Sequence, residues 1–291
     1  MKSSYQIPIV IAEIGCNHKG DIQIAKDLIK HAAVCGVQVV KFQKRSNVDL
    51  LSDEQYNAPH PNPANSYGNT YGSHREFLEF DIATHKSLKK FAESLNLIYS
   101  TSVWDIKSAR EVIDLNPKFI KVPSACNTNF VLLEFIRDNY NGDIHISLGM
   151  TNLEEEIEIL ETFQKTNALN RVVLYSCTSG YPVSFKDVCL LEILRIRDKY
   201  INKIKDIGFS GHHLGIAIDN AAYTLGANYI ERHFTLDRTW KGTDHAASLE
   251  PTGMRKLVRD LRATQKSLTF KSTEILEIEN DQRNKLKFFD K

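Results

Sequence analysis

One strand–helix–strand unit is complete within residues 207–233, IGFSGHHLGIAIDNAAYTLGANYIERH. The apolar run at 207–210 predicts a buried strand, and the run at 229–232 predicts a second one. Between them, apolar residues at helical spacing predict a helix over 216–225. Because a helix connects the two strands, we expect them to lie parallel in one sheet. The unit therefore predicts an α/β fold built from repeated strand–helix pairs.

The same alternation runs along almost the whole chain of 291 residues. The expected strands are 8–13, 38–42, 97–101, 119–122, 144–147, 172–175, 207–210 and 229–232. Eight strands, each followed by a helix, predict a (β/α)8 TIM barrel in a single domain. An open, doubly wound sheet is the second choice, but no GxGxxG motif follows the first strand.

Helix signals separate these strands. Asp21 is suited to cap a helix that ends at Gly36. Residues 151–154, TNLE, have the pattern of a capping box, and the helix that follows is expected to bury Leu153, Ile157 and Leu160 on one side. The other helices are expected at about 84–93, from 106 onward, at about 132–136, through 190–194, at 216–225 and at 251–268.

Two segments fall outside the alternation. Residues 44–80 are rich in Pro, Asn, Gly and Tyr. Loops of this length are commonly lids or binding loops, so we expect this one to cover the site. Residues 1–270 are expected to form the barrel, and residues 271–291 a charged C-terminal tail.

The composition excludes several classes of partner. The formal net charge is +1, so no basic surface for nucleic acid or for a membrane is indicated. No apolar run approaches the roughly 20 residues of a membrane span, and no signal peptide opens the chain. The five cysteines form no CxxC pair. We therefore expect a cytoplasmic protein with reduced cysteines.

Polar side chains end the expected strands, which is where a TIM barrel places its active site. The candidates are Glu13, Lys41, Gln43, Thr101, Lys121, Ser124, Ser147, Ser179, Tyr181, Ser210, His212, His233 and Asp244. Lys41 and Lys121 are flanked by apolar residues, so each ammonium group is expected to be desolvated and to need an anion beside it. That anion is either a bound substrate or an internal carboxylate such as Glu13 or Asp244. The hydroxyls are suitable donors to a phosphate and a carboxylate, although each alone is more often a cap or turn residue.

Two of the ten histidines stand out by position. His212 and His233 end adjacent strands, which places both side chains within reach of one ion. Neutral imidazoles bind divalent metals, and two protein ligands leave coordination positions open for a substrate. Packing is the more frequent role for a single histidine, but the pair at adjacent strand ends favours a metal site.

The chain resembles the sialic acid synthase family, the phosphoenolpyruvate-dependent synthases of nine-carbon sugar acids. The resemblance covers about residues 8–265, and its motifs occur in the family's order. These motifs are EIGCNHKG at 13–20, VKFQ at 40–43, STS at 100–102, KVPS at 121–124, SLGM at 147–150, CTSGYP at 177–182, FSGH at 209–212, ERHFT at 231–235 and TDHAASLEP at 243–251.

The resemblance implies roles for the candidate residues. Phosphoenolpyruvate would be held by Lys41, Thr101, Lys121, Ser124, Ser147, Ser179 and Ser210. His212 and His233 would hold a divalent metal, manganese first, with magnesium or cobalt as alternatives. Gln43, Tyr181 and Asp244 would face the sugar, N-acetylmannosamine or a related aldose. The resemblance also implies a homodimer.

The implied reaction joins the two substrates by a new carbon–carbon bond. The metal would polarise the aldehyde of the open-chain sugar, and the methylene carbon of phosphoenolpyruvate would attack it. Water then adds to the enol carbon, and phosphate leaves by C–O cleavage. Glu13 or Asp244 would position the water or relay protons, and Lys41 and Lys121 would complete the catalytic group.

The chain departs from the family pattern at three points. Many members have glutamate at the position of Cys126 and asparagine at that of Ser179, and we expect the form without the family's small C-terminal antifreeze-like domain. Three alternatives stay open: a synthase of another keto-deoxy sugar acid, a non-catalytic phosphosugar-binding barrel, and a metal-dependent hydrolase. A hydrolase of this fold usually has a denser metal site and no phosphate-binding lysines.

Overall fold

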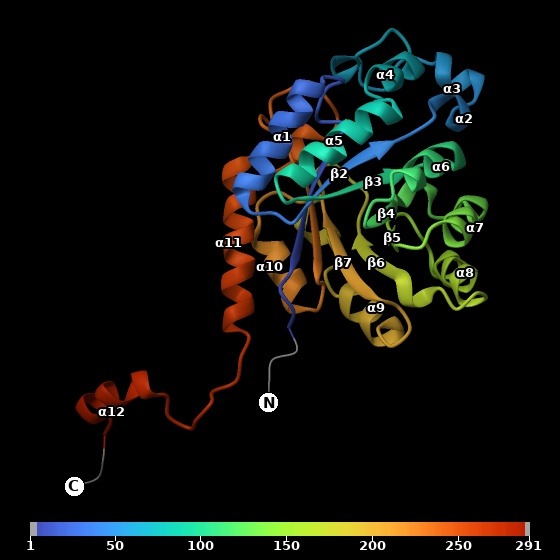
Figure 1. Cartoon of the computed structure of the whole chain (residues 1–291). Coiled ribbons are helices and arrows are strands. Elements are labelled where there is room, and N and C mark those ends of the chain that lie inside the picture. The colour runs from blue at the N-terminus through green and yellow to red at the C-terminus, as the bar shows by residue number, and fades with distance from the viewer. Residues whose placement is uncertain (1–4, 289–291) are drawn as a thin grey trace.

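The computed structural model describes residues 5–288 and contains a closed barrel of eight parallel strands in sequential order (Figure 1). The strands are β1 Ile9–Gly15, β2 Val39–Lys44, β3 Ile98–Val103, β4 Phe119–Val122, β5 Asp143–Ser147, β6 Val172–Cys177, β7 Asp206–Gly211 and β8 Tyr229–His233. Pairing of β8 with β1 closes the barrel, with Glu13 opposite His233. The predicted TIM barrel is confirmed.

The described chain contains twelve α-helices, most of which cover the outside of the barrel. They are α1 Ile22–Cys35, α2 Asn47–Leu50, α3 Asp53–Asn57, α4 Tyr71–Phe77, α5 Ile82–Ser94, α6 Ile106–Asp114, α7 Phe130–Asn139, α8 Leu153–Gln164, α9 Glu192–Tyr200, α10 Ala217–Thr224, α11 Pro251–Ser267 and α12 Asn280–Leu286. The Asp21 carboxylate caps α1 by accepting from the backbone N–H groups of Gln23 and Ile24, and Gly36 ends that helix with φ 81°.

Helix α8 differs from its prediction in two ways. Its capping box joins Asn152 to Glu155, one residue later than expected. Leu153 and Ile157 are 58% and 44% exposed, whereas Leu160 is buried as predicted. The inward face also contains Glu156, whose carboxylate accepts hydrogen bonds from Arg195 and Tyr200 on α9. This buried polar contact turns Leu153 and Ile157 toward solvent, so apolar spacing alone gave the wrong face.

Residues along each strand alternate between two apolar layers. One layer fills the inside of the barrel and contains Ile11, Val39, Phe119, Val173 and Tyr175. The other lies between the strands and the surrounding helices and is much larger. Side chains that point inward above the inner layer therefore face the carboxyl ends of the strands.

The long segment after β2 is folded rather than irregular. Residues 44–80 contain α2, α3 and α4 and lie at the opposite end of the barrel from the N-terminus (Figure 1). An ion pair between Arg45 and Glu79 joins the two ends of this segment. The Tyr67 hydroxyl donates to the carbonyl of Lys241, which ties the segment to the loop after β8. The segment therefore packs over the end of the barrel where a site is expected.

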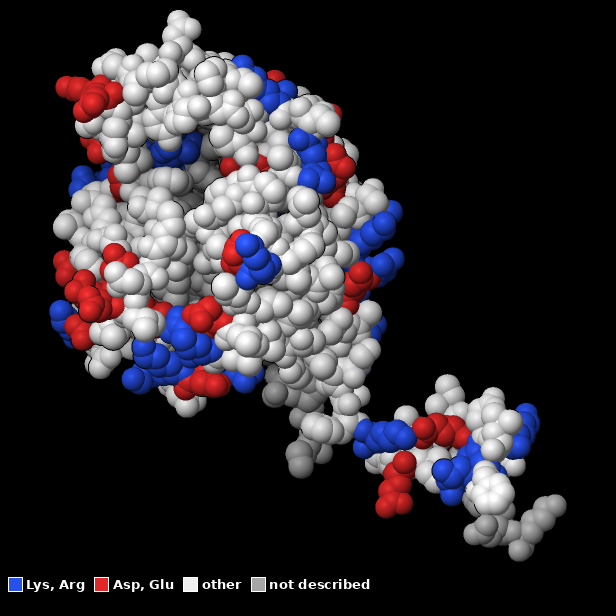
Figure 2. All heavy atoms as spheres, turned by 180° about the vertical axis from the view of Figure 1, so that it is seen from behind, with Lys and Arg blue, Asp and Glu red and all other residues white. Residues whose placement is uncertain are grey.

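The remaining described chain leaves the barrel. After α11, residues 268–288 extend away from the other elements and end with α12 (Figure 1). Within residues 5–288, no helix has both the length and the apolar character needed to cross a membrane. On the face seen in Figure 2, positive and negative side chains lie interspersed in small groups, in keeping with the near-zero net charge.

Candidate active site

A cavity of about 310 Å³ lies at the carboxyl ends of the strands. Its walls bring together eleven of the thirteen predicted residues, from strands and loops all round the barrel. These are Glu13, Lys41, Gln43, Lys121, Ser124, Ser147, Ser179, Tyr181, Ser210, His212 and His233. Side chains separated by more than 200 residues in the sequence therefore share one space.

Two lysines and two glutamates form the floor of this cavity. Lys41 Nζ pairs with a Glu13 carboxylate oxygen and lies 3.7 Å from Glu231 Oε1. Lys121 Nζ donates to the same Glu231 oxygen at 2.6 Å. All four side chains are almost fully buried. We call Glu13, Lys41, Lys121 and Glu231 the lysine–glutamate cluster.

The charges in this cluster balance. Burial by itself raises the pKa of the Glu231 carboxyl, but the charges of Lys121 and Lys41 outweigh it and lower that pKa to about 2. Burial lowers the pKa of Lys121, and the attraction of Glu231 opposes that shift. Each lysine thus has an internal carboxylate partner. For Lys41 that partner is Glu13, as one alternative had it, and for Lys121 it is Glu231 rather than Asp244.

Serine hydroxyls surround the cavity above the cluster. Ser124, Ser147, Ser179 and Ser210 all line it. The loop after β5 reaches them through Gly149, where a Cβ atom would lie 2.5 Å from Ser179 Oγ and 2.6 Å from Ser124 Oγ. A Cβ atom at this position would force both hydroxyls to move, which favours glycine here. The arrangement offers several O–H donors to an anion placed over the lysines.

Strand β3 contributes a different residue from the one predicted. Thr101 does not line the cavity; it lies on the same side of the strand as Tyr99, which packs in the outer apolar layer. Ser102 points inward instead and accepts a hydrogen bond from Lys41 Nζ at 2.7 Å. The position of Thr101 therefore does not support a substrate contact, and Ser102 takes its place in the site.

The two histidines face each other on one wall. Their ring centroids are 5.4 Å apart, and the Tyr181 ring lies 4.3 Å from that of His212. His212 Nδ1 is 2.9 Å from the Thr178 carbonyl oxygen, which can only accept, so the proton is assigned to Nδ1 and the Nε2 lone pair is free. Burial, reinforced by His233, lowers the pKa of His212 to about 3, which keeps this imidazole neutral.

This donor set fits a divalent cation. Buried His233 Nδ1 has no hydrogen-bond partner in the part of the chain that the structure describes. It lies 3.8 Å from Asp244 Oδ2, so Asp244 lies beside the histidine pair rather than in the cavity wall. Within residues 5–288, no group of three or more His, Cys, Asp or Glu side chains is arranged to hold a metal. A cation bound by His212 and His233 would therefore take its other ligands from substrate or water.

Seven further residues of the cavity wall were not predicted from the sequence. They are Ser102, Trp104, Pro123, Ala125, Met150, Cys177 and Glu231. Glu231 had a usable signal, because it precedes His233 by two residues on one strand and so points to the same side. Trp104 follows the end of β3, where a helix start rather than a site residue was the expected feature.

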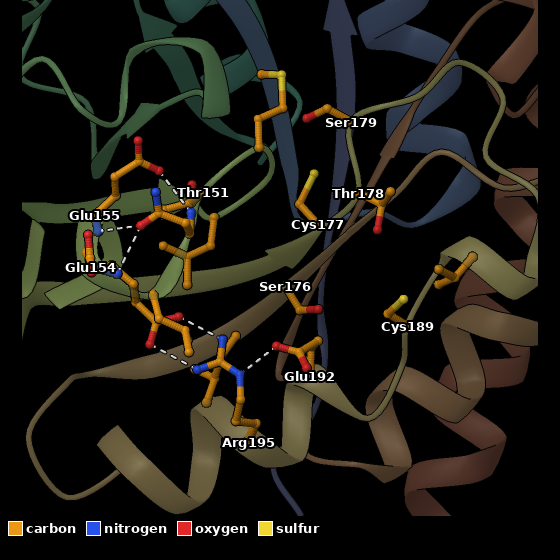
Figure 3. A pocket seen from close by; sticks show the side chains of 17 residues that line it. Thr151, Glu154, Glu155, Ser176, Cys177, Thr178, Ser179, Cys189, Glu192 and Arg195 are labelled. Atoms are coloured by element: carbon orange, nitrogen blue, oxygen red, sulfur yellow. Dashed lines mark hydrogen bonds and ion pairs between the residues drawn. The ribbon is translucent and has the colours of Figure 1, made fainter.

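A larger cavity of about 1280 Å³ adjoins the first and lies between α8 and α9 (Figure 3). The two cavities share Met150, Cys177 and Ser179 in their walls. In the wall of the larger cavity, Arg195 forms ion pairs with Glu156 and with Glu192; Figure 3 labels Arg195 and Glu192. Among the described residues, no lysine and no histidine lines this larger cavity, so the candidate catalytic side chains lie in the smaller one.

Comparison with known proteins places the chain in a family. Residues 28–273 match the NeuB family. The chain belongs to this family. It is 36% identical to human N-acetylneuraminate-9-phosphate synthase over 272 residues, which are 93% of this chain and 74% of the human protein. It is also 36% identical to the N,N'-diacetyllegionaminic acid synthase of Campylobacter jejuni over 261 residues, 89% of this chain and 77% of that protein.

A solved structure supports the fold of this NeuB family member. The N-acetylneuraminic acid synthetase of Leptospira borgpetersenii, in complex with citrate, matches with a TM-score of 0.80 and 26% identity. The match covers 97% of this chain and 93% of that one. The relatives named above are synthases of sugar acids.

Proposed function

We propose that this NeuB family member condenses phosphoenolpyruvate with an aldose of the N-acetylmannosamine type and releases phosphate by C–O cleavage. The observation that carries the proposal is the lysine–glutamate cluster beneath a set of serine hydroxyls, in one cavity with a neutral histidine pair. The cluster and hydroxyls suit an anionic substrate, and the histidine pair suits a cation facing a carbonyl group. The names of the relatives, which include synthases of different sugar acids, support the same reaction class.

In this proposal the polar floor binds phosphoenolpyruvate. Lys41 and Lys121 face its carboxylate and phosphate, and the hydroxyls of Ser102, Ser124, Ser147, Ser179 and Ser210 donate to its oxygens. Glu231 remains ionised beneath it, because the charges of Lys121 and Lys41 lower its pKa, and Glu13 pairs with Lys41. These carboxylates would stabilise positive charge that develops at the enol carbon when the methylene carbon attacks the aldehyde.

The histidine wall receives the aldose. When a divalent cation, proposed to be manganese, is bound by His212 and His233, it acts as a Lewis acid on the aldehyde oxygen. Gln43 and Tyr181 line the same cavity and would contact the sugar hydroxyls. Glu13 or Asp244 would hold the water that adds to the enol carbon and accept its proton, after which the phosphate leaves.

Two further features of the family remain part of the proposal, namely action as a homodimer and a cytoplasmic location. A synthase of another keto-deoxy sugar acid is the second candidate, since one relative makes a legionaminic acid by its name. That candidate uses the same floor of the cavity and differs only in the aldose. The choice therefore depends on the wall that faces the sugar.

The test is turnover of phosphoenolpyruvate with a panel of aldoses. The purified chain, supplied with Mn²⁺, is incubated with each sugar, and both phosphoenolpyruvate consumption and keto acid formation are measured. Phosphoenolpyruvate carrying ¹⁸O in its bridging position should yield labelled phosphate, because the C–O bond breaks. Removal of the metal with a chelator should stop turnover, and His212→Ala should weaken Mn²⁺ binding sharply. Unlabelled phosphate, or full turnover without metal in a His212→Ala, His233→Ala variant, would contradict the mechanism.

A further inference from the structure

Three buried hydrogen-bond donors meet where the segment 44–80 packs against the end of β3. Arg75 on α4 places its guanidinium carbon 5.2 Å from the centroid of the Trp104 ring. Arg75 Nε also donates to Asn47 Oδ1 at 3.2 Å. Asn47 is 2% exposed and Arg75 is 9% exposed, while Trp104 lines the active-site cavity. We call Asn47, Arg75 and Trp104 the Arg75 cluster.

The donors of this cluster exceed its acceptors. The amide nitrogen Nδ2 of Asn47 and the indole nitrogen Nε1 of Trp104 are both buried and have no hydrogen-bond partner among the residues that the structure describes. Within residues 5–288, the hydrogen bonds of Arg75 go to neutral groups, the Asn47 amide oxygen and the Tyr71 hydroxyl. Since buried donors are nearly always paired in folded proteins, two orphans beside one guanidinium require an explanation.

The guanidinium of Arg75 also has no counter-ion in the described part of the chain. Among residues 5–288, no carboxylate oxygen lies within 4.0 Å of Arg75; Glu79 pairs with Arg45 instead, and Asp105 accepts from Ser46 and Ser108. Burial, and then the nearby charge of Arg45, lower the pKa of Arg75 from its ordinary value. A buried cation without an anion is costly, so the site is arranged for an anion that comes from outside the chain.

The position of the cluster relates it to the proposed reaction. In a closed barrel with strands in sequential order, β3 lies across from β7. Trp104, at the end of β3, therefore stands opposite His212, at the end of β7, and both line the one cavity. A sugar whose aldehyde faces the histidine pair would extend its far end toward Trp104.

We infer that the Arg75 cluster binds a phosphate monoester at the far end of the aldose, so that the second substrate is an aldose phosphate. This inference rests on the proposed function and names the substrate class of the same site. A phosphate offers several acceptor oxygens and a double negative charge, which suits a guanidinium flanked by an amide N–H and an indole N–H. A neutral sugar end would leave the guanidinium without a counter-ion.

The decisive experiment compares N-acetylmannosamine with its 6-phosphate as substrates of the full chain with Mn²⁺. We expect kcat/KM to favour the phosphorylated sugar by about 100-fold, the size expected when a site built for a charged hydrogen-bonding group is left unfilled. Arg75→Met should bring the ratio of the two kcat/KM values close to one. Arg75→Lys, which keeps the charge, should restore part of the preference.

Two further variants separate recognition from structure. Trp104→Phe keeps an aromatic ring but removes the indole N–H, and it serves as the test if Arg75→Met does not fold. This variant should reduce the preference for the phosphorylated sugar by about 10-fold. Arg195→Met is the matched control, because Arg195 is a partly buried arginine that already pairs with Glu156 and Glu192. That control should leave the ratio of the two substrates as in the unmodified chain.

The outcomes are distinguishable. Equal use of both sugars, a preference for the unphosphorylated one, or an equal loss for both sugars in Arg75→Met would overturn the inference while leaving the synthase reaction intact. Inhibition by free phosphate that Arg75→Met relieves, without any preference between the sugars, would also overturn it and assign the cluster to inorganic phosphate. If neither sugar is consumed, the proposed function fails, and calorimetric titration with N-acetylmannosamine 6-phosphate decides. Binding that Arg75→Met abolishes supports the cluster, and no binding to the unmodified chain overturns it.

Discussion

The inside of the barrel contains an apolar layer, which we call the lower layer, and a charged layer above it, which we call the upper layer. The two layers are two residues apart along each strand. Ile11, Val39 and Phe119 belong to the inner apolar layer. Glu13, Lys41 and Lys121 follow each of them by two residues, on the same side of the same strands. Glu231 likewise follows Tyr229, which packs against the lower layer. A step of two residues thus separates the part of the barrel that holds the fold from the part that carries the chemistry.

Stability of the fold does not account for the charged layer. Apolar side chains in its place would give a barrel at least as stable, because buried ion pairs seldom repay their desolvation. The lower layer shows such packing, because Ile11, Val39, Phe119 and Val173 form one buried cluster. The ring of His145 stacks on Phe119 in the same layer, at 3.9 Å between centroids. The charged layer is therefore best explained by a substrate, and mutations in the two layers should have opposite effects.

The largest expected effect is on turnover, from the upper layer. The double variant Lys121→Met, Glu231→Gln removes both charges of one pair, so no uncompensated carboxylate is left at that position. We expect kcat/KM for phosphoenolpyruvate to fall by about 10³-fold or more, with the free energy of unfolding changed by about 1 kcal/mol or less. Steady-state kinetics and urea denaturation measure the two quantities. Retained turnover would show that the pair only supports the fold.

The lower layer should respond in the opposite way. Phe119→Ala removes a ring that is 3% exposed and is expected to cost about 3–5 kcal/mol of unfolding free energy. In the molecules that remain folded, kcat/KM should change only a few-fold. Denaturant unfolding, with kinetics normalised to the folded fraction, tests this. A loss of turnover as large as that of the upper variant, at unchanged stability, would erase the distinction between the layers.

A neighbouring pair on β3 sharpens the comparison within a single strand. Ser102 points into the cavity and Thr101 away from it. Ser102→Ala removes the hydroxyl partner of Lys41 and is expected to lower kcat/KM for phosphoenolpyruvate by about 10-fold. Thr101→Val is the matched control and should lower it by less than about 3-fold. A greater loss in the Thr101 variant would restore the sequence-based assignment of that residue.

The smallest expected effect concerns acid stability of the lower layer. Burial holds the pKa of His145 well below 6.5, so this ring stays neutral in the folded chain. In the unfolded chain a histidine gains a proton below about pH 6.5, so the unfolded state binds more protons and stability falls as the pH drops. His145→Phe removes this contribution. The loss of unfolding free energy between pH 7.5 and 5.7 should shrink by about 1 kcal/mol, as measured by urea denaturation at both values.

His145→Phe also deprives the Tyr175 hydroxyl of its partner, which lies 2.8 Å from His145 Nδ1. That cost is similar at both pH values and does not enter the difference. An unchanged pH dependence in the variant would mean that protonation of His145 does not contribute to acid unfolding.

Local sequence determined the elements and the residues that end them. Apolar runs, the cap at Asp21 and the turn at Gly36 depend on neighbours in the chain, and these signals placed eight strands close to their observed bounds. Alternation and strand order then sufficed to bring His212 and His233 together, because adjacent parallel strands end side by side. The two buried lysines were also evident, since each stands between apolar residues.

Partners across the barrel were decided only by the tertiary structure. Glu231 meets Lys121 across 110 residues of sequence, and that contact exists only once the barrel closes. In the run 100–102 every residue is polar, so alternation could not tell Thr101 from Ser102. The inward face of α8 depended on Arg195, a residue of another helix. The Arg75 cluster likewise joins a helix of the segment 44–80 to the end of β3. Short-range patterns encode which side of an element is apolar, whereas the pairing of buried charges depends on closure of the whole chain.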